Sequence, residues 1–409
     1  MRDGWTEMTL GDMAEVNPET TKGMPPQQHI RYIDLSAVSA DSGIDESAVI
    51  DYELRSAPGR ARRVVRHGDV LVSTVRPYLR GFAVVPESLD GAVASTGFTV
   101  LRARKELSLP GFVWSIVSKA DFADRLMERA TGSNYPAVRP NDIAEQVVLL
   151  PPLVVQRRVV DLVDAVDTYA AAAARFSESS STHLAALCEA VFEVGAPMMA
   201  MTDLAVPKGL IGGPFGSSLV AKDYVDEGVP VIRGTNMPKA GCFVGGEFAH
   251  VSPEKADQLR RNLAAPGDVV FTQRGTLGQV GLVPAAGPDR YVVSQSQMRL
   301  RPNPDLVLGE YVFLVFRSPR MVAEVLGRNT ATANPHINLG ILAGLEIPVP
   351  ALAEQAAIVE LAWSSMAVAE RAEDLRRDVQ RLRSALLDEL LSGECEIPGS
   401  YDELVGLVA

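Results

Sequence analysis

The sequence has few cysteines, no long apolar run and no excess of basic residues. The three cysteines, Cys188, Cys242 and Cys395, are odd in number and far apart, so neither a disulfide framework nor a paired zinc site is indicated. No apolar run approaches the ~20 residues that a membrane span needs, and Met1 to Glu15 lacks the apolar core of a signal peptide. We therefore expect a soluble, cytoplasmic protein.

Familiar catalytic patterns are also missing. There is no Asn-Pro-Pro-aromatic methyltransferase motif and no Gly-Lys-Ser/Thr phosphate loop, and the five histidines are scattered. A nuclease hidden in one part of the chain would require clustered carboxylates with a Lys on one strand, and no convincing set is found. The sequence predicts a protein without a catalytic centre, a metal site or a cofactor of its own.

The formal net charge is -12, which argues against a protein that binds the phosphate groups of a nucleic acid over its whole surface. The sequence leaves room for local basic patches and for a partner that supplies phosphate contacts. One such patch is residues 55–80, which contain a single carboxylate, Asp69, and seven arginines: Arg55, Arg60, Arg62, Arg63, Arg66, Arg76 and Arg80. A solvated charged face explains such a patch as well as DNA binding does.

The chain is an internal duplication of two modules. An offset of 199 residues pairs Ile33 with Ile232 and the run Gly68–Val70 with Gly267–Val269, and it holds as far as Leu187 with Leu386. Each module is rich in Gly and Pro and favours an α+β fold. In the first we expect strands at 69–73 and 98–101 and a helix over 111–129, and in the second strands at 268–272 and 297–300 and a helix over 310–326.

Long amphipathic helices follow Pro151-Pro152 and Pro350. A helix of about 38 residues spans about 57 Å, more than one turn of duplex DNA. Each apolar stripe needs a partner, so we expect the two helices to pair as an antiparallel coiled coil with the modules at opposite ends in pseudo-two-fold symmetry. The run Ser177–Ser181 predicts a bend or break. The expected domains are 1–150 and 195–349 for the modules, 151–194 and 350–393 for the helical spacers, and 394–409 for a tail.

The chain resembles the specificity subunits of type I restriction-modification systems. The resemblance covers nearly the whole chain, and the second half carries the more specific matches. The matching stretches are Gly213-Pro214-Phe215-Gly216-Ser217-Ser218-Leu219, Asp223-Tyr224, 228–234, 266–271, Arg274-Gly275-Thr276-Leu277-Gly278, Ile347-Pro348-Val349-Pro350, Ala353-Glu354-Gln355 and Ile358. The first half departs from this pattern at Lys22–Pro26 and at Val155-Gln156. The departures indicate two target recognition domains that read different halves of a bipartite DNA target with a nonspecific gap.

The resemblance implies a scaffold without catalysis. In such systems the subunit binds two adenine methyltransferase subunits, which carry S-adenosylmethionine, and can recruit two restriction subunits that translocate DNA, on which ATP and Mg are expected. Apolar surface left exposed on the paired helices would be the docking site. The residues expected at this subunit interface are Gln156, Val160, Val163, Gln355, Val359, Leu382 and Leu386.

Base readout needs donors and acceptors on turns at the rim of a rigid module, with Arg suited to guanine and Asn or Gln to adenine. In the first module the candidates are Arg76, Tyr78, Arg80, Ser95, Thr96, Ser133, Asn134 and Tyr135. In the second module they are Gln273, Arg274, Thr276, Gln295, Gln297, Thr332, Asn334 and His336. Core packing of Tyr78 and Tyr135, internal pairing of Ser95 and Gln297, and a turn role for His336 remain open.

A tandem-domain adaptor that binds protein or peptide is the main alternative. It takes the acidic charge at face value and predicts no salt-sensitive DNA binding.

Overall fold

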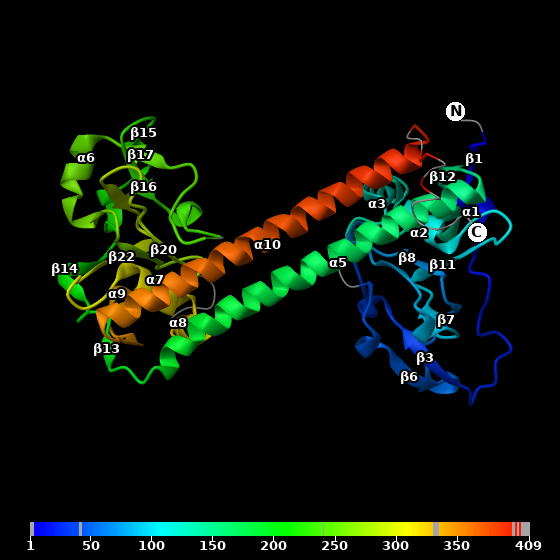
Figure 1. Cartoon of the computed structure of the whole chain (residues 1–409), viewed down its shortest axis with the longest axis horizontal. Coiled ribbons are helices and arrows are strands. Elements are labelled where there is room, and N and C mark those ends of the chain that lie inside the picture. Colours follow the sequence, from blue (N-terminus) through cyan, green and yellow to red (C-terminus); the bar gives the residue numbers. More distant parts are fainter. Residues whose placement is uncertain are drawn as a thin grey trace. The chain divides into compact units, whose positions relative to one another are not determined.

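The computed structural model describes residues 4–40, 43–239, 241–329, 335–394, 397–398 and 401. The chain forms two compact units, which can be followed by colour in Figure 1. Unit 1 contains Met1–Ala172 and Arg377–Ala409, and unit 2 contains Ala173–Arg376. Each unit therefore combines a globular part with a portion of each of two long helices.

Unit 1 is built around two four-stranded sheets. The first sheet has the order β2-β11-β8-β9, formed by Ala14–Val16, Phe98–Ala103, Val70–Ser73 and Phe82–Val84. The second has the order β6-β3-β10-β7, formed by Ile50–Glu53, His29–Ile33, Val93–Ser95 and Ala61–Val64. Val70 and Val72 face one apolar core and Leu71 faces another, which explains why β8 is a continuous apolar run.

Among the described residues, unit 1 also has two short ladders and four short α-helices in its globular part. The ladders are β1 (Thr6–Thr9) with β12 (Val147–Leu150) and β4 (Val38–Ser39) with β5 (Gly43–Ile44). The helices are α1 (Leu10–Met13), α2 (Pro110–Val117), α3 (Ala120–Met127) and α4 (Pro140–Ala144).

Unit 2 repeats this plan with a four-stranded and a five-stranded sheet. The four-stranded sheet has the order β14-β22-β19-β20, formed by Ala205–Gly212, Gln297–Pro302, Val269–Thr272 and Val280–Leu282. The five-stranded sheet has the order β15-β17-β16-β21-β18, formed by Tyr224–Val225, Ala249–Val251, Val229–Ile232, Tyr291–Val293 and Leu263–Ala264. The ladder β13 (Met198–Ala200) with β23 (Glu346–Pro348) matches β1 with β12.

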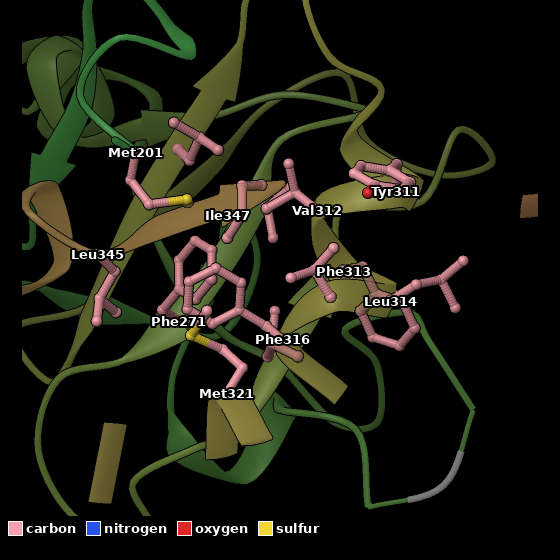
Figure 2. Packing of buried hydrophobic residues seen from close by; sticks show 14 of the residues in the cluster. Met201, Phe271, Tyr311, Val312, Phe313, Leu314, Phe316, Met321, Leu345 and Ile347 are labelled. Atoms are coloured by element: carbon pink, nitrogen blue, oxygen red, sulfur yellow. The ribbon is translucent and has the colours of Figure 1, made fainter. Parts of the chain in front are cut away.

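The helices of unit 2 are α6 (Pro253–Gln258), α7 (Gly309–Arg317), α8 (Pro319–Gly327) and α9 (Leu339–Ala343). Figure 2 shows the core that α7 and α8 cover, in which the rings of Phe271 and Phe316 lie 4.7 Å apart. The single helix expected over 310–326 is wrong, because Ser318 and Pro319 start a new helix. The Ser318 hydroxyl accepts from the Met321 amide at 3.1 Å, and proline suits the first helical position.

The single helix expected over 111–129 is wrong in the same way. Helix α2 ends at Val117, and Lys119 has a backbone outside the helical region before α3 begins at Ala120. The break therefore occurs at the same place in both modules.

The long helices are α5 (Leu153–Ala190) and α10 (Leu352–Ser392). In unit 1, Arg158 donates to the carbonyl of Ile397 at 3.2 Å, and Arg383 forms an ion pair with Asp167. From Arg158 to Asp167 along α5, the partner moves back from Ile397, just beyond α10, to Arg383 of α10, so the helices run antiparallel as expected. The expected break at Ser177 is wrong: α5 continues, and the buried Ser177 hydroxyl donates to Glu373 of α10 at 3.0 Å in unit 2.

The duplication holds at the level of single hydrogen bonds. In unit 1, Arg102 donates two bonds to the buried Asp69, at 2.9 and 2.8 Å. In unit 2, Arg301 does the same to Asp268 at 2.9 and 2.8 Å. These hydrogen bonds raise the pKa of both arginines. Both pairs obey the offset of 199 residues, which confirms the α+β duplication.

Candidate nucleic-acid interface

Three segments of unit 1 that are distant in sequence meet at one end of β8. The backbone amide of Thr74 donates to Gly97 at 2.8 Å, and the amide of Arg76 donates to Pro136 at 2.7 Å. The amide of Val138 returns a bond to Thr74 at 2.9 Å. We call residues 74–80, 95–97 and 131–138 the unit 1 loop cluster. It contains every DNA-binding candidate of the first module.

Arg76 occupies a strained position in this cluster. Its φ of 50° is in the left-handed region, and its guanidinium carbon lies 4.4 Å from the centre of the Tyr135 ring. Its buried Nε has no hydrogen-bond partner among the described residues. Arg80 also has a φ of 50°, and it donates to the Ala120 carbonyl at 2.5 Å. Both arginines of this loop therefore have a left-handed backbone conformation and a side chain held by a specific contact.

Both tyrosines of the cluster are exposed, which answers the alternative that they pack in the core. Tyr135 is 68% exposed and Tyr78 is 48% exposed. Thr96, Ser133 and Asn134 are exposed as well. These side chains are free to meet a partner.

Unit 2 repeats the loop cluster bond for bond. The amide of Gln273 donates to Ser296 at 2.8 Å, that of Gly275 to Pro335 at 3.2 Å, and that of Ile337 to Gln273 at 3.0 Å. Each bond matches a bond of unit 1 at the offset of 199 residues. We call the described residues of 273–279, 294–297 and 335–337 the unit 2 loop cluster.

The repeat shows that Arg76 and Arg274 do not occupy equivalent positions. Arg274 bridges His336, as Val75 bridges Ala137 in unit 1, so Arg274 corresponds to Val75. Arg76 corresponds to Gly275. The two arginines sit one position apart on otherwise equivalent loops, so the modules present charge differently.

The remaining candidates of unit 2 divide by exposure. Arg274 and Thr276 are exposed, whereas Gln273 and His336 are half-buried. Gln295 is largely exposed, yet its Nε2 donates to the carbonyls of Gly216 at 2.7 Å and Leu219 at 3.0 Å. Thr332 and Asn334 lie outside the described residues.

Two candidates are buried, which removes them from the surface. Ser95 accepts a bond from the Gly97 amide at 3.2 Å, and Gln297 receives the hydroxyl of Ser294. The Ser95 hydroxyl and the side-chain oxygen of Gln297 are thus paired internally, while the buried Nε2 of Gln297 has no partner among the described residues. Both side chains are buried within the loop clusters and cannot contact a base directly.

Three of the seven arginines of the 55–80 patch form ion pairs with carboxylates. Arg55 pairs with Glu53, Arg60 with Asp34, and Arg66 with Glu19. The bonds from Arg66 hold the pKa of Glu19 below its usual range, whereas burial lowers the pKa of Arg63. Among the described residues, no carboxylate lies within ion-pair distance of Arg76, Arg80 or Arg274. Three arginines of the loop clusters therefore keep a positive charge that no described carboxylate compensates.

Phe215 is a prominent surface residue that is missing from the DNA-binding candidates predicted from the sequence. It is 94% exposed and lies in the Gly-Pro-Phe-Gly loop that follows β14. The sequence signal that could have identified it is an aromatic residue within a Gly-Pro-Phe-Gly turn.

Gln156 and Gln355 act inside the units, because both are fully buried. Gln156 accepts from the Leu109 amide at 3.0 Å and donates to the carbonyls of Leu107 and Pro151 at 2.8 and 2.9 Å. Gln355 makes the same three bonds, with Leu308 at 2.9 Å, Leu306 at 2.9 Å and Pro350 at 2.8 Å. Each glutamine ties the start of a long helix to the globular part of its unit.

The other interface candidates also differ in exposure. Val163 and Val359 are buried in the cores of their units, and Val160 and Leu386 are partly buried. Leu382 is 55% exposed. Leu361 and Val368, seven residues apart on α10, are exposed apolar residues that the prediction missed. These three leave apolar surface on α10.

Among the described residues, no group of three or more His, Cys, Asp or Glu could hold a metal ion. Nor is any described helix long and apolar enough to cross a membrane.

The type I restriction modification DNA specificity domain matches residues 218–361, which lie in unit 2. The specificity subunit of the type I restriction enzyme HindI from Haemophilus influenzae is 22% identical over 116 residues, or 28% of this chain and 25% of that protein. The match thus spans about a quarter of that relative's length.

Two solved structures cover nearly the whole chain. One, from work on complex assembly and conformational transition of the type I R-M system, has 26% identity and a TM-score of 0.61 over 96% of this chain and 98% of that one. The S subunit of a type I system from M. genitalium has 11% identity and a TM-score of 0.56 over 96% and 97%, which shows the shared fold. The chain is therefore similar to the specificity subunits of type I restriction-modification systems, in the domain matched within unit 2 and in the fold of nearly the whole chain.

Proposed function

We propose that this chain recognises a bipartite DNA target, each unit reading one half with its loop cluster. The observation that carries the proposal is the repeated cluster, which holds an arginine without a described carboxylate partner in both units, half-buried at Arg76 and exposed at Arg274. A guanidinium group forms two parallel hydrogen bonds with the O6 and N7 atoms of guanine in the major groove. The arginines are therefore the main candidates for base readout.

The two halves of the target differ in sequence. Arg76 and Arg274 stand at neighbouring, non-equivalent positions, and Tyr135 supports the arginine of unit 1 alone. Non-equivalent donors on equivalent loops select different bases, so the target is asymmetric.

The chain acts without catalysis of its own and works within a complex. A net charge of -12 leaves little positive surface for phosphate, so partner subunits supply much of that contact. The partners are two adenine methyltransferase subunits, which bring S-adenosylmethionine, and restriction subunits, which bring ATP and Mg. Leu361 and Val368, on the part of α10 in unit 2, are the apolar surface offered to them.

Binding measurements test the proposal. Fluorescence anisotropy is recorded for DNA carrying the target, with the isolated chain and with the methyltransferase complex, over a range of salt concentrations. We expect weak binding alone and tight, salt-sensitive binding in the complex. Nanomolar binding by the isolated chain contradicts the charge argument, and salt-insensitive binding or none in the complex supports the adaptor alternative.

A further inference from the structure

The loop that carries Phe215 is tightly anchored at both ends. A side chain at Gly213 would place its Cβ 1.9 Å from the Ser294 carbonyl oxygen, so the backbones can touch only because this residue is glycine. Gly216 has a φ of 56°, in the left-handed region. Between these glycines the chain turns sharply and lifts Phe215 into solvent.

The anchors belong to the unit 2 loop cluster. The Gly213 amide donates to the Gln297 carbonyl at 3.0 Å, and the side chain of Gln295 bonds the carbonyls of Gly216 and Leu219. The segment 294–297 in turn accepts the amides of Gln273 and Arg274 through Ser296, at 2.8 and 3.2 Å. Phe215 and Arg274 are therefore carried by loops fastened to the same short segment.

Exposure of a whole phenyl ring is costly in water, and at 94% exposure the ring contributes little packing to unit 2. A phenyl ring has no donor for phosphate, so beside a DNA-reading loop its favourable contacts are with bases. Phenylalanine enters base steps as a wedge or packs on the methyl group of thymine.

We propose that Phe215 makes an apolar contact with the bases of the half-site that unit 2 reads. This inference rests on the proposed function and adds a residue to it. The contact is restricted to one half of the target, because the first module opens with Lys22–Pro26 in place of the Gly-Pro-Phe-Gly loop.

The test uses the methyltransferase complex and DNA carrying its mapped target. Phe215→Ala is expected to weaken binding about tenfold or more, and Phe215→Leu less. Phe243→Ala is the matched control: this half-exposed residue bridges Leu282, which pairs with Val269 at the end of β19 away from Arg274. The control should bind DNA as the wild type does, and thermal unfolding of Phe215→Ala should match the wild type.

Two modified DNAs locate the contact. Increased 2-aminopurine emission in the unit 2 half-site, lost in Phe215→Ala, indicates a wedge, and weaker binding after replacement of thymine by uracil indicates a methyl contact. The inference is overturned if Phe215→Ala binds DNA as tightly as the wild type. It is also overturned if the variant no longer binds the methyltransferase, because Phe215 would then contact that subunit and not DNA. Failure of the wild-type complex to bind any mapped target overturns the proposed function itself.

Discussion

Charge compensation separates the arginines of this protein into two groups. Those paired with carboxylates gain little from DNA, whereas Arg76, Arg80 and Arg274 keep their charge available. We expect Arg76→Ala to cost about 1–3 kcal/mol of binding free energy and to relax specificity in the unit 1 half-site alone. Binding to targets substituted at each position measures this. Arg55→Ala, paired with Glu53, is the control, and equal losses in both variants would contradict the assignment.

The two buried glutamines lead to a prediction about stability. Gln355→Ala removes three hydrogen bonds and leaves the Leu308 amide and two carbonyls unpaired inside unit 2. We expect a loss of about 2–4 kcal/mol in the free energy of unfolding, and the same for Gln156→Ala. Denaturant unfolding measures it, with the exposed Gln380→Ala on α10 as the control. A loss below about 0.5 kcal/mol in both variants would refute the structural role.

Single residues were predictable where their chemistry sets their position. Turns after apolar strands correctly placed Arg76 and Arg274 on loops that meet other loops. The sequence failed at Ser95 and Gln297, because strands of three to six residues do not reveal which side chain faces inward. It also missed Phe215, whose exposure depends on the close approach of Gly213 to Ser294.

The long helices were predictable as elements, because their apolar stripes continue over many turns. Their details depend on tertiary contacts. Ser177 would weaken an isolated helix, but here its hydroxyl bonds Glu373 and the helix continues. Conversely, Ser318-Pro319 divides an apolar run that otherwise resembles one helix.

The apolar residues left on α10 lead to a prediction about assembly. We expect Leu361→Asp with Val368→Asp to abolish co-purification of the methyltransferase, because two charges would be buried at the docking surface. Affinity purification from co-expressing cells measures it. Val225→Asp, on a half-exposed edge strand of the same unit, is the control. Retained methyltransferase in the double variant would place the docking surface elsewhere.

The whole molecule is a duplication of one module. Under the proposed function, each unit should recognise its half of the DNA target independently of the other. Exchange of residues 212–345 for the equivalent segment of a relative replaces the unit 2 loop cluster and leaves that of unit 1 intact. We expect one half of the recognised sequence to change and the other to stay. A change in both halves would show that the units do not read DNA independently.

The most direct measurement is to co-express the chain with a type I adenine methyltransferase subunit and to map methylated adenines in the host DNA by sequencing. We expect a two-part motif with a fixed gap, which is lost when Arg76 and Arg274 are both replaced by Ala. The absence of a motif together with the absence of a co-purifying methyltransferase would contradict the proposed function.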